Sequence, residues 1–465
     1  MDMTAEPTAY RPYAAILELG QDYYDPVKAA DFPQAILRFR NDRAVAAVGL
    51  DGMSDEEWIG HFARFESLPD NLVEPLALRY HGHQFRVYNP DIGDGRGFLF
   101  AQMLDAQGRL LDLGTKGSGQ TPYSRFGDGR LTLKGGVREL LATEMLEALG
   151  VETSKTFSLI ETGEPLERND EPSPTRSAVL VRLQHSHIRI GTFQRLATLG
   201  LPDQIAKLTD YCLRHYYPDD DGGSAPARLL AHVTRATARL AASYIAAGFV
   251  HGVLNSDNIA ITAQSFDYGP WRWTPFWDNH FTAAYFDHQG LYSFGRQPEA
   301  IHWDLVQLAV SLRRIEEAEP LTKRLEGFAG HFQEALRDAI FARLAIAVGA
   351  LADDMILVHT IEEALSAQSV QLDRFYFDWR GGELRKETKA YDGEEYERFR
   401  RLIAKRSPLP GATAHDYWSD EAPCSMHIEE VEAIWSRIDE ADDWSALDAK
   451  VAAVRRMGQA HHAAA

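Results

Sequence analysis

The feature that most constrains the fold is a run of polar residues between His251 and Asp267. Asn258 follows His251 by seven positions and Asp267 follows Asn258 by nine, with the apolar residues 259–261 between them. This layout is typical of a catalytic loop followed by a metal-binding loop, in which the Asn and the second acid ligate magnesium on a nucleoside triphosphate. A chain with this layout is expected to fold into two lobes around a bound nucleotide.

The position that usually holds the catalytic base carries an aliphatic residue instead. Protein kinases place an Asp two residues after the His, in the pattern His-Arg-Asp-x-x-x-x-Asn, whereas this chain has Val253 there. A Val side chain cannot take a proton from a hydroxyl group, so either the chain is catalytically dead or another acid serves. Asp257, directly before Asn258, is the candidate base.

The composition limits the classes of function. The chain has 465 residues, of which 45% are hydrophobic, which is enough for a large core. A formal charge of −20 disfavours binding to nucleic acid or to an anionic membrane. Only Cys212 and Cys424 are present, which excludes a disulfide scaffold. No targeting peptide or membrane span is evident, so a cytoplasmic protein is expected.

The predicted elements divide the chain into four parts: a helical N-terminal extension (1–75), a β-rich small lobe (76–190), a helical large lobe (191–405) and a C-terminal extension (406–465). The small lobe is expected to hold strands at 98–103, 109–114, 157–160 and 177–183 and a helix at 136–149. In the large lobe, helices are predicted at 203–217, 227–249, 298–312, 321–351 and 361–367, and a short strand pair at 259–261 and 265–267. The fold class is α+β, a protein-kinase-like two-lobe fold with additional N- and C-terminal helical segments.

The predicted small lobe offers cations and close backbone approach for a polyanion. Lys116 ends a predicted strand and Glu139 lies in the following helix, an order typical of a Lys that contacts phosphates and a carboxylate that steadies it. Glycine-rich turns at 117–119 and 127–130 let backbone amides approach phosphates. Arg182 and Arg189 lead out of the last strand and are suited to clamp a terminal phosphate.

Each of these signals also has an ordinary structural explanation. A single Gly-x-Gly turn is common, and two charges far apart in sequence more often form a surface ion pair. Their joint order on the expected elements favours a nucleotide site. The pairs His81-x-His83 and His185-x-His187 are interpreted as structural, because no third metal ligand is evident. Cys424 has no neighbouring partner that would indicate a reactive thiol.

Several longer sequence blocks resemble one known family. They are Gly82-His83-Gln84-Phe85, Gly93-Asp94-Gly95-Arg96-Gly97, Lys116-Gly117-Ser118-Gly119, Gly127-Asp128-Gly129-Arg130, the stretch from His251 to Asn258, Asp267-Tyr268-Gly269-Pro270 and Asp287-His288-Gln289-Gly290. Together, over residues 75–315, they are similar to the selenoprotein O (SelO) family of pseudokinase-fold protein adenylyltransferases.

The resemblance implies an activity and a set of site residues. Family members bind ATP in a reversed orientation and transfer AMP, rather than the γ-phosphate, to a Ser, Thr or Tyr hydroxyl of another protein. The nucleotide contacts that it implies are Gly93, Gly95, Arg96, Lys116, Asp128, Gly129, Arg182, Arg189 and Asp267. It further implies Asn258 and Asp267 as ligands of Mg²⁺ or Mn²⁺, Asp257 as the base and Glu139 as support for Lys116. The implied partners are ATP and protein substrates.

The resemblance breaks down at the cysteines. Family members often carry a Cys before the Asp-His-Gln-Gly block, where this chain has Ala283, and another close to the C-terminus, whereas Cys424 lies well before the last residue. Redox regulation through a disulfide between these two cysteine positions is therefore not expected. Two alternatives stay open: γ-phosphate transfer with Asp257 as the base, and a non-catalytic pseudokinase scaffold that binds nucleotide. UTP also stays open as a competing nucleotide.

Overall fold

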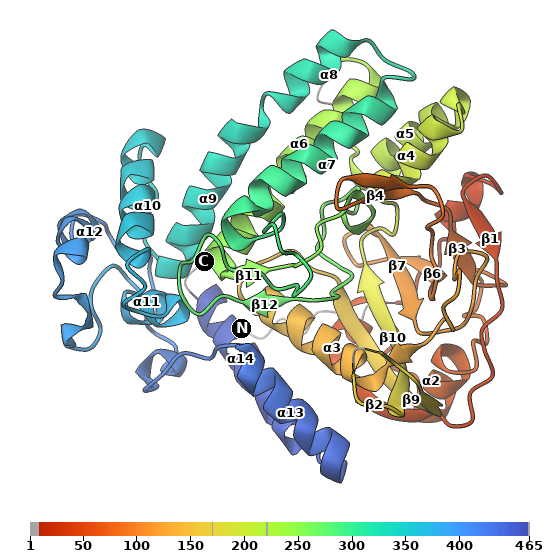
Figure 1. Ribbon diagram of the computed structural model, residues 1–465, viewed down its shortest axis with the longest axis horizontal. Coiled ribbons are helices and arrows are strands. Elements are labelled where there is room, and N and C mark those ends of the chain that lie inside the picture. Colours follow the sequence, from red (N-terminus) through yellow and green to blue (C-terminus); the bar gives the residue numbers. More distant parts are fainter. Residues whose placement is uncertain (1–8, 170, 220–221, 464–465) are drawn as a thin grey trace.

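The computed structural model describes residues 9–169, 171–219 and 222–463, which form a sheet-containing lobe and a helical lobe side by side (Figure 1). The chain passes from the last long strand of the sheet into the first helix of the large lobe at Arg189. This arrangement is the kinase-like α+β fold that the sequence predicts.

The small lobe is built on one antiparallel sheet. Along the sheet the strand order is β1 (Tyr24–Pro26), β3 (Leu76–Leu78), β6 (Gly97–Leu104), β7 (Leu110–Lys116), β10 (Thr175–Gln184), β9 (Lys155–Leu166) and β2 (Ile36–Arg40), while β8 (Leu131–Thr132) pairs with β10. β6, β7, β9 and β10 confirm the four predicted strands. In the register of this sheet Gly97 faces Lys116, and Gly114 faces Arg182. The sheet therefore brings Lys116 next to the glycine-rich loop at 93–97.

Both faces of the sheet are covered by apolar side chains from helices. On one face, α3 (Leu133–Ala148) packs so closely that Gly136 lies against Leu159 of β9. On the other face, α2 (Asp55–Phe62) stacks Trp58 on Phe157 of the same strand, with ring centroids 5.1 Å apart. Residues two apart on a regular strand share a face, but the register of β9 shifts at Phe157, between the pairs Thr156–Arg182 and Ser158–Val181. This irregularity lets one strand supply both layers.

The first 75 residues differ from the helical extension that was predicted. They contribute β1 and β2 to the two edges of the sheet, besides the helices α1 (Asp42–Ala47) and α2. β2 pairs with β9, and Arg38 forms an ion pair with Glu161 across these strands at 2.6 Å. Pairing with a distant strand overrides local propensity here, because a five-residue segment carries too short a pattern to identify a strand.

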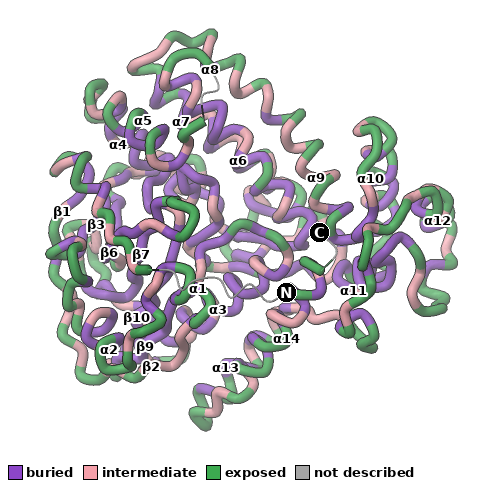
Figure 2. The backbone as a smooth tube through the Cα atoms, turned by 180° about the vertical axis from the view of Figure 1, so that it is seen from behind, coloured by how far each residue is buried: buried purple, intermediate pink, exposed green. Residues whose placement is uncertain are grey.

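The large lobe is organised around the buried helix α6 (Ala225–Ala247), which is purple along most of its length in Figure 2. The remaining helices are α4 (Ile190–Thr198), α5 (Pro202–Tyr216), α7 (Gln297–Leu312), α8 (Ala318–Leu325), α9 (Phe328–Leu344), α10 (Leu351–Leu365), α11 (Leu372–Asp378) and α12 (Glu397–Ile403). The predicted helices at 203–217, 227–249 and 298–312 are confirmed. No helix within the described ranges has the length and apolarity to cross a membrane.

The prediction of a single helix over 321–351 is wrong. The chain forms α8 and α9 instead, and α9 ends where Ala345 takes a left-handed conformation with φ of +50°. The residues predicted as a helix at 361–367 belong in part to α10, which begins at Leu351.

The C-terminal helices α13 (Ile428–Ala441) and α14 (Ser445–His462) pack against α3 of the small lobe (Figure 1). Arg455 Nη2 lies 2.6 Å from Glu144 Oε1, and the Glu144 side chain is almost fully buried. The C-terminal extension thus supports the helix that also carries Glu139.

Candidate active site

A cleft of about 740 Å³ lies where the two lobes meet. Seven of its lining side chains are cationic and five are acidic, although the whole chain carries a charge of −20. Of the predicted site residues, those that line the cleft are Gly93, Gly95, Arg96, Lys116, Asp128, Gly129, Arg182, Arg189, Asp257 and Asp267. Glu139 and Asn258 are not among the lining residues. Such a cleft is suited to a polyanionic ligand.

Lys116 ends β7 and is buried at the base of the cleft. Its ammonium group contacts the carboxylate of Glu139 on α3 and lies 2.6 Å from Asp267 Oδ1. The Lys116 and Glu139 side chains are only 6% and 4% exposed, so their contact is not the surface ion pair that was the ordinary explanation. Lys116 therefore connects α3 with the loop that carries Asp267.

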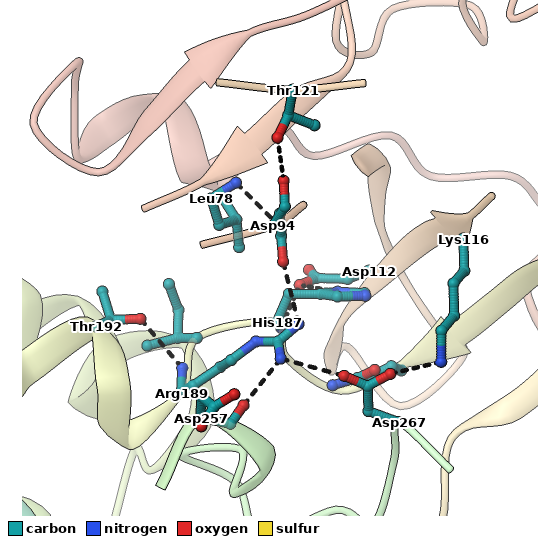
Figure 3. A network of polar contacts seen from close by, with 12 residues as sticks. Leu78, Asp94, Asp112, Lys116, Thr121, His187, Arg189, Thr192, Asp257 and Asp267 are labelled. Carbon is teal, nitrogen blue, oxygen red and sulfur yellow. Dashed lines mark hydrogen bonds and ion pairs between the residues drawn. The ribbon is translucent and has the colours of Figure 1, made fainter. Parts of the chain in front are cut away.

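Arg189, at the start of α4, connects the two lobes through three acidic residues (Figure 3). Its Nη2 donates to Asp94 Oδ1 at 3.1 Å, and its Nη1 donates to the backbone carbonyl oxygen of Asp257 at 2.8 Å. Nη1 also lies 3.5 Å from Asp267 Oδ2. The guanidinium carbon lies 4.3 Å from the centre of the Tyr80 ring. These contacts fix the position of a charge that is almost completely buried.

Arg182 lies on β10, and its guanidinium group, like that of Arg189, lies near the Phe266 ring. Its Nη1 is 3.7 Å from Asp267 Oδ1, and the guanidinium carbon lies 5.2 Å from the centre of the Phe266 ring. Nη1 is buried and has no hydrogen-bond partner in the described part of the chain. A buried guanidinium nitrogen without a partner, in a residue that lines a cleft, is suited to bind an anionic group.

The candidate base Asp257 lies in the short turn η2 (Ser256–Asn258) and is 7% exposed. Burial raises the pKa of Asp257 to about 6, although the positive charge of Arg189 opposes that shift. The side chain lies directly against Gly82 of β4 (Gly82–Gln84). A carboxylate whose pKa lies near neutral pH is suited to accept a proton from a hydroxyl group.

The hairpin formed by β4 and β5 (Val87–Asn89) holds the catalytic loop from the side of the small lobe. The backbone N–H of His83 donates to Ser256 Oγ at 2.8 Å, and that of Phe85 donates to Asn255 Oδ1 at 3.0 Å. Both acceptors are buried residues, one and two positions before Asp257. The hairpin therefore fixes the backbone that presents the candidate base.

The loop that carries Asp267 is held by backbone contacts rather than by the predicted strand pair. Isolated bridges join Ala260 to Arg189 and Ser265 to Thr153, and residues 259–261 do not pair with 265–267. His251 contributes as well, because its Nε2 lies 3.0 Å from the carbonyl oxygen of Phe266. Each of the two segments pairs with a residue far away in the sequence, and the short apolar runs do not indicate such pairing.

Asp267 is the acid on which the cations of the cleft converge. Burial alone would raise its pKa, but Lys116, Arg182 and Arg189 hold the pKa of Asp267 well below its usual value. Its backbone has a left-handed conformation with φ of +62°. Asp267 is therefore ionised over the whole physiological pH range and available to a cation.

Asn258 and Asp267 come from consecutive loops and offer an amide and a carboxylate oxygen. Asn258 Nδ2 donates to the carbonyl oxygen of Val253 at 3.0 Å, which fixes the plane of the amide. These oxygen donors fit a hard divalent cation such as Mg²⁺ or Mn²⁺. Within the described ranges no group of three or more His, Cys, Asp and Glu side chains could hold a metal. Phosphate and water oxygens would therefore complete the coordination.

Three predicted nucleotide contacts lie at the outer part of the cleft. Arg96 and Asp128 are exposed, and Asp128 forms an ion pair with Arg168 at 2.8 Å. Gly129 is required for a close approach, since a Cβ atom there would lie 2.2 Å from the backbone of Gly119. The glycine-rich turn is thus folded back against the end of β7.

Sequence reasoning missed the residues that hold Arg189. Asp94 also accepts a hydrogen bond from the Leu78 backbone at 3.1 Å, and Tyr80 supplies the ring beneath the guanidinium group. The available signal was Asp94 itself, an acid inside a glycine-rich loop whose Gly93, Gly95 and Arg96 were expected to contact the nucleotide. An acid at such a position indicates that a cation lies nearby.

Comparisons with known proteins show the family of the chain. The family model described as "Protein adenylyltransferase SelO" matches residues 8–455. The chain is 49% identical to a protein nucleotidyltransferase YdiU of Synechocystis sp., over 70% of this chain and 68% of that protein. It is 43% identical to the YdiU protein of Gloeobacter violaceus, over 94% of this chain and 92% of that protein. A rhoptry antigen kinase domain of Toxoplasma gondii aligns over 62% of this chain and 92% of its own length, at a TM-score of 0.30 and 10% identity. The chain belongs to the SelO family of protein adenylyltransferases.

Proposed function

We propose that this chain transfers AMP from ATP to Ser, Thr or Tyr hydroxyl groups of protein substrates and releases pyrophosphate. The observation that carries the proposal is the inner part of the cleft, where Arg182 and Arg189 are 6% and 2% exposed. Two buried guanidinium groups suit the triphosphate end of a nucleotide, whose negative charge compensates theirs, better than an uncharged purine. This arrangement supports a nucleotide that enters with its phosphates innermost.

In this orientation the terminal phosphate contacts Arg182 and Arg189, and Lys116, held by Glu139, aligns the inner phosphates. Gly93, Gly95, Arg96, Asp128 and Gly129 would contact the outer part of the nucleotide. Asn258 and Asp267 would hold Mg²⁺ or Mn²⁺, which supplies neutralisation of phosphate charge when it is bound. The α-phosphate then faces the mouth of the catalytic loop.

Asp257 takes the proton in the reaction. The oxygen of the acceptor hydroxyl forms a bond to the α-phosphorus, and the bond from that phosphorus to the oxygen bridging to the β-phosphate breaks. The hydroxyl proton passes to the carboxylate of Asp257, and pyrophosphate leaves among the cations of the cleft. A pKa of about 6 leaves Asp257 mostly ionised at neutral pH, as a base requires.

The partners follow from the same chemistry. A charge of −20 favours a protein rather than a nucleic acid as the acceptor. Cys212 and Cys424 are both free thiols, which fits a reducing compartment such as the cytoplasm, where ATP is available.

Mass analysis of the modified hydroxyl tests the proposal. The protein is incubated with ATP and Mg²⁺ or Mn²⁺, alone and with an added acceptor protein, beside the Asp267→Ala variant as control. An adenylyl group on Ser, Thr or Tyr with wild type, and none with the variant, is the expected result. A phosphoryl group would indicate kinase chemistry, and no adduct with either metal would indicate a scaffold.

A further inference from the structure

Arg182 contacts a row of buried side chains that do not line the cleft. Asp112 of β7 accepts hydrogen bonds at Oδ2 from the backbone N–H of His187 at 2.8 Å and from His187 Nδ1 at 3.1 Å. Arg182 Nε in turn lies 3.4 Å from His187 Nε2. The other oxygen of Asp112 accepts from Gln102 Nε2 at 2.7 Å. All of these residues are more than nine-tenths buried.

The two neighbours of His187 determine which ring nitrogen carries the proton. An ionised carboxylate only accepts hydrogen bonds, so Nδ1 holds the proton and donates it to Asp112. Nε2 is then an acceptor and receives the Nε–H of Arg182. A second proton on the ring would place two donors and two positive charges face to face. Burial lowers the pKa of His187, which keeps the ring neutral.

The sheet leaves room for this ring at one position. Gly114 of β7 faces Arg182 in the strand register, and a Cβ atom at Gly114 would lie 2.1 Å from His187 Nε2. Glycine weakens a strand interior, so its presence there commonly marks a close approach. The His187 ring occupies the space that a side chain at position 114 would otherwise take.

His185 and His187 have different surroundings, although both belong to the same His-x-His pattern. The His185 ring packs against Tyr216 with ring centroids 5.4 Å apart, and its backbone N–H donates to Gln264 Oε1 at 2.7 Å. His185 does not line the cleft that contains Arg182. It is therefore a matched control, two residues away from His187 and of the same type.

We propose that His187, fixed by Asp112, is a positioning residue that aligns Arg182 with the terminal phosphate of ATP. This inference rests on the proposed function of the same cleft. His187 accepts the hydrogen bond of Arg182 Nε. Arg182 Nη1 has no hydrogen-bond partner in the described part of the chain, so it stays available to the ligand. An arginine held in this way loses little conformational entropy when the phosphate binds.

The test compares ATP affinity, measured by calorimetry with Mg²⁺, and the kinetic constants of four single variants. His187→Phe keeps a ring but removes the acceptor, and we expect ATP affinity to fall about tenfold, the effect of one hydrogen bond to a charged group. KM for ATP should rise by a similar factor while kcat changes little, as expected for lost binding to the phosphate end. His187→Gln retains an acceptor and should recover most of the affinity. Asp112→Asn, which removes the preference for a proton on Nδ1, should weaken binding, and His185→Phe should not.

A double-mutant cycle separates positioning from a general structural effect. Once Arg182→Gln has removed the guanidinium group, His187→Phe should cause no further loss of ATP affinity. The inference is overturned if the two losses add in full, or if His187→Phe binds ATP as wild type does. ATP binding is measured directly. If the effects of His187→Phe and Arg182→Gln on ATP affinity are coupled but no AMP is transferred, only the proposed function is contradicted. AMP transfer without coupling would contradict only the role of His187.

Discussion

Gly82 packs directly against the carboxyl group of Asp257, because a Cβ atom added at Gly82 would lie 2.9 Å from Asp257 Oδ1 and 3.0 Å from its Cβ. These two residues belong to different lobes, and the hairpin that starts at Gly82 also donates backbone hydrogen bonds to the neighbours of Asp257. The small lobe thus determines where the proposed base lies. This contact can be tested with a single methyl group.

Gly82→Ala should lower AMP transfer by about tenfold to a hundredfold, because the added methyl group displaces the carboxylate from the position where it meets the hydroxyl group. Gly269→Ala is the matched control, since a Cβ atom there has no neighbour within 4 Å although the residue lies in the metal-binding loop. Initial rates at saturating ATP measure both. Equal rates for the two variants would show that the contact does not position the base.

The pH dependence of the reaction should follow the ionisation of Asp257. The pKa of this carboxyl is raised to about 6 and only its ionised form accepts a proton, so kcat/KM should fall by about tenfold per unit as the pH drops below about 6. ATP binding by Asp257→Asn over the same pH range corrects for titration of the nucleotide itself. A rate that stays constant from pH 7 down to pH 5 would contradict a role for Asp257 as the base.

Asp257→Asn should abolish AMP transfer and stabilise the fold. A folded pKa of about 6 exceeds the ordinary value of 3.8, so the ionised carboxylate destabilises the folded state at high pH. At pH 8 the variant should gain about 2–3 kcal/mol in the free energy of unfolding, and the gain should vanish as the pH falls toward 4. Urea unfolding at both pH values measures this. A variant that is less stable at pH 8 would show that the carboxylate has a favourable structural role.

Arg455→Met should destabilise the protein because it leaves Glu144, a carboxylate on α3 that is only 2% exposed, with Arg43 as its remaining partner. We expect a loss of about 3 kcal/mol, the low end for breaking a buried ion pair. Arg456→Met is the control, since Arg456 pairs with partly exposed carboxylates such as Asp420. Its loss should change the free energy of unfolding little. Chemical unfolding of the two neighbouring variants measures the difference, and equal midpoints would argue against the buried pair.

The elements that were predicted correctly share one property, which is that their signal is local. β6, β7, α3 and α6 are long enough for several turns or alternations of apolar residues, so the pattern alone identifies them. β1 and β2 are three- and five-residue edge strands, and they form only because distant strands pair with them. Ala345 ends α9 inside an otherwise helical pattern, without a glycine or proline to mark the place.

For the candidate site, the sequence predicted ten residues that line the cleft, but it did not predict their contacts or their ionisation. Spacing predicted Lys116 at the end of a strand, which is β7, and Asn258 and Asp267 on two consecutive loop segments, because these short segments have a regular pattern. The contact of Asp94 with Arg189 and that of Asp112 with His187 join residues far apart in sequence, and nothing local indicates them. The raised pKa of Asp257 likewise depends on burial that only the packed structure reveals.

The most direct measurement uses ATP labelled separately at the α- and γ-phosphates. The wild-type protein is incubated with each form, an acceptor protein and Mg²⁺ or Mn²⁺, and protein-bound label is counted after denaturation. If the phosphates enter the cleft first and Asp257 activates a hydroxyl group, only the α-label becomes protein-bound and the γ-label leaves as pyrophosphate. Protein-bound γ-label without α-label would contradict the account.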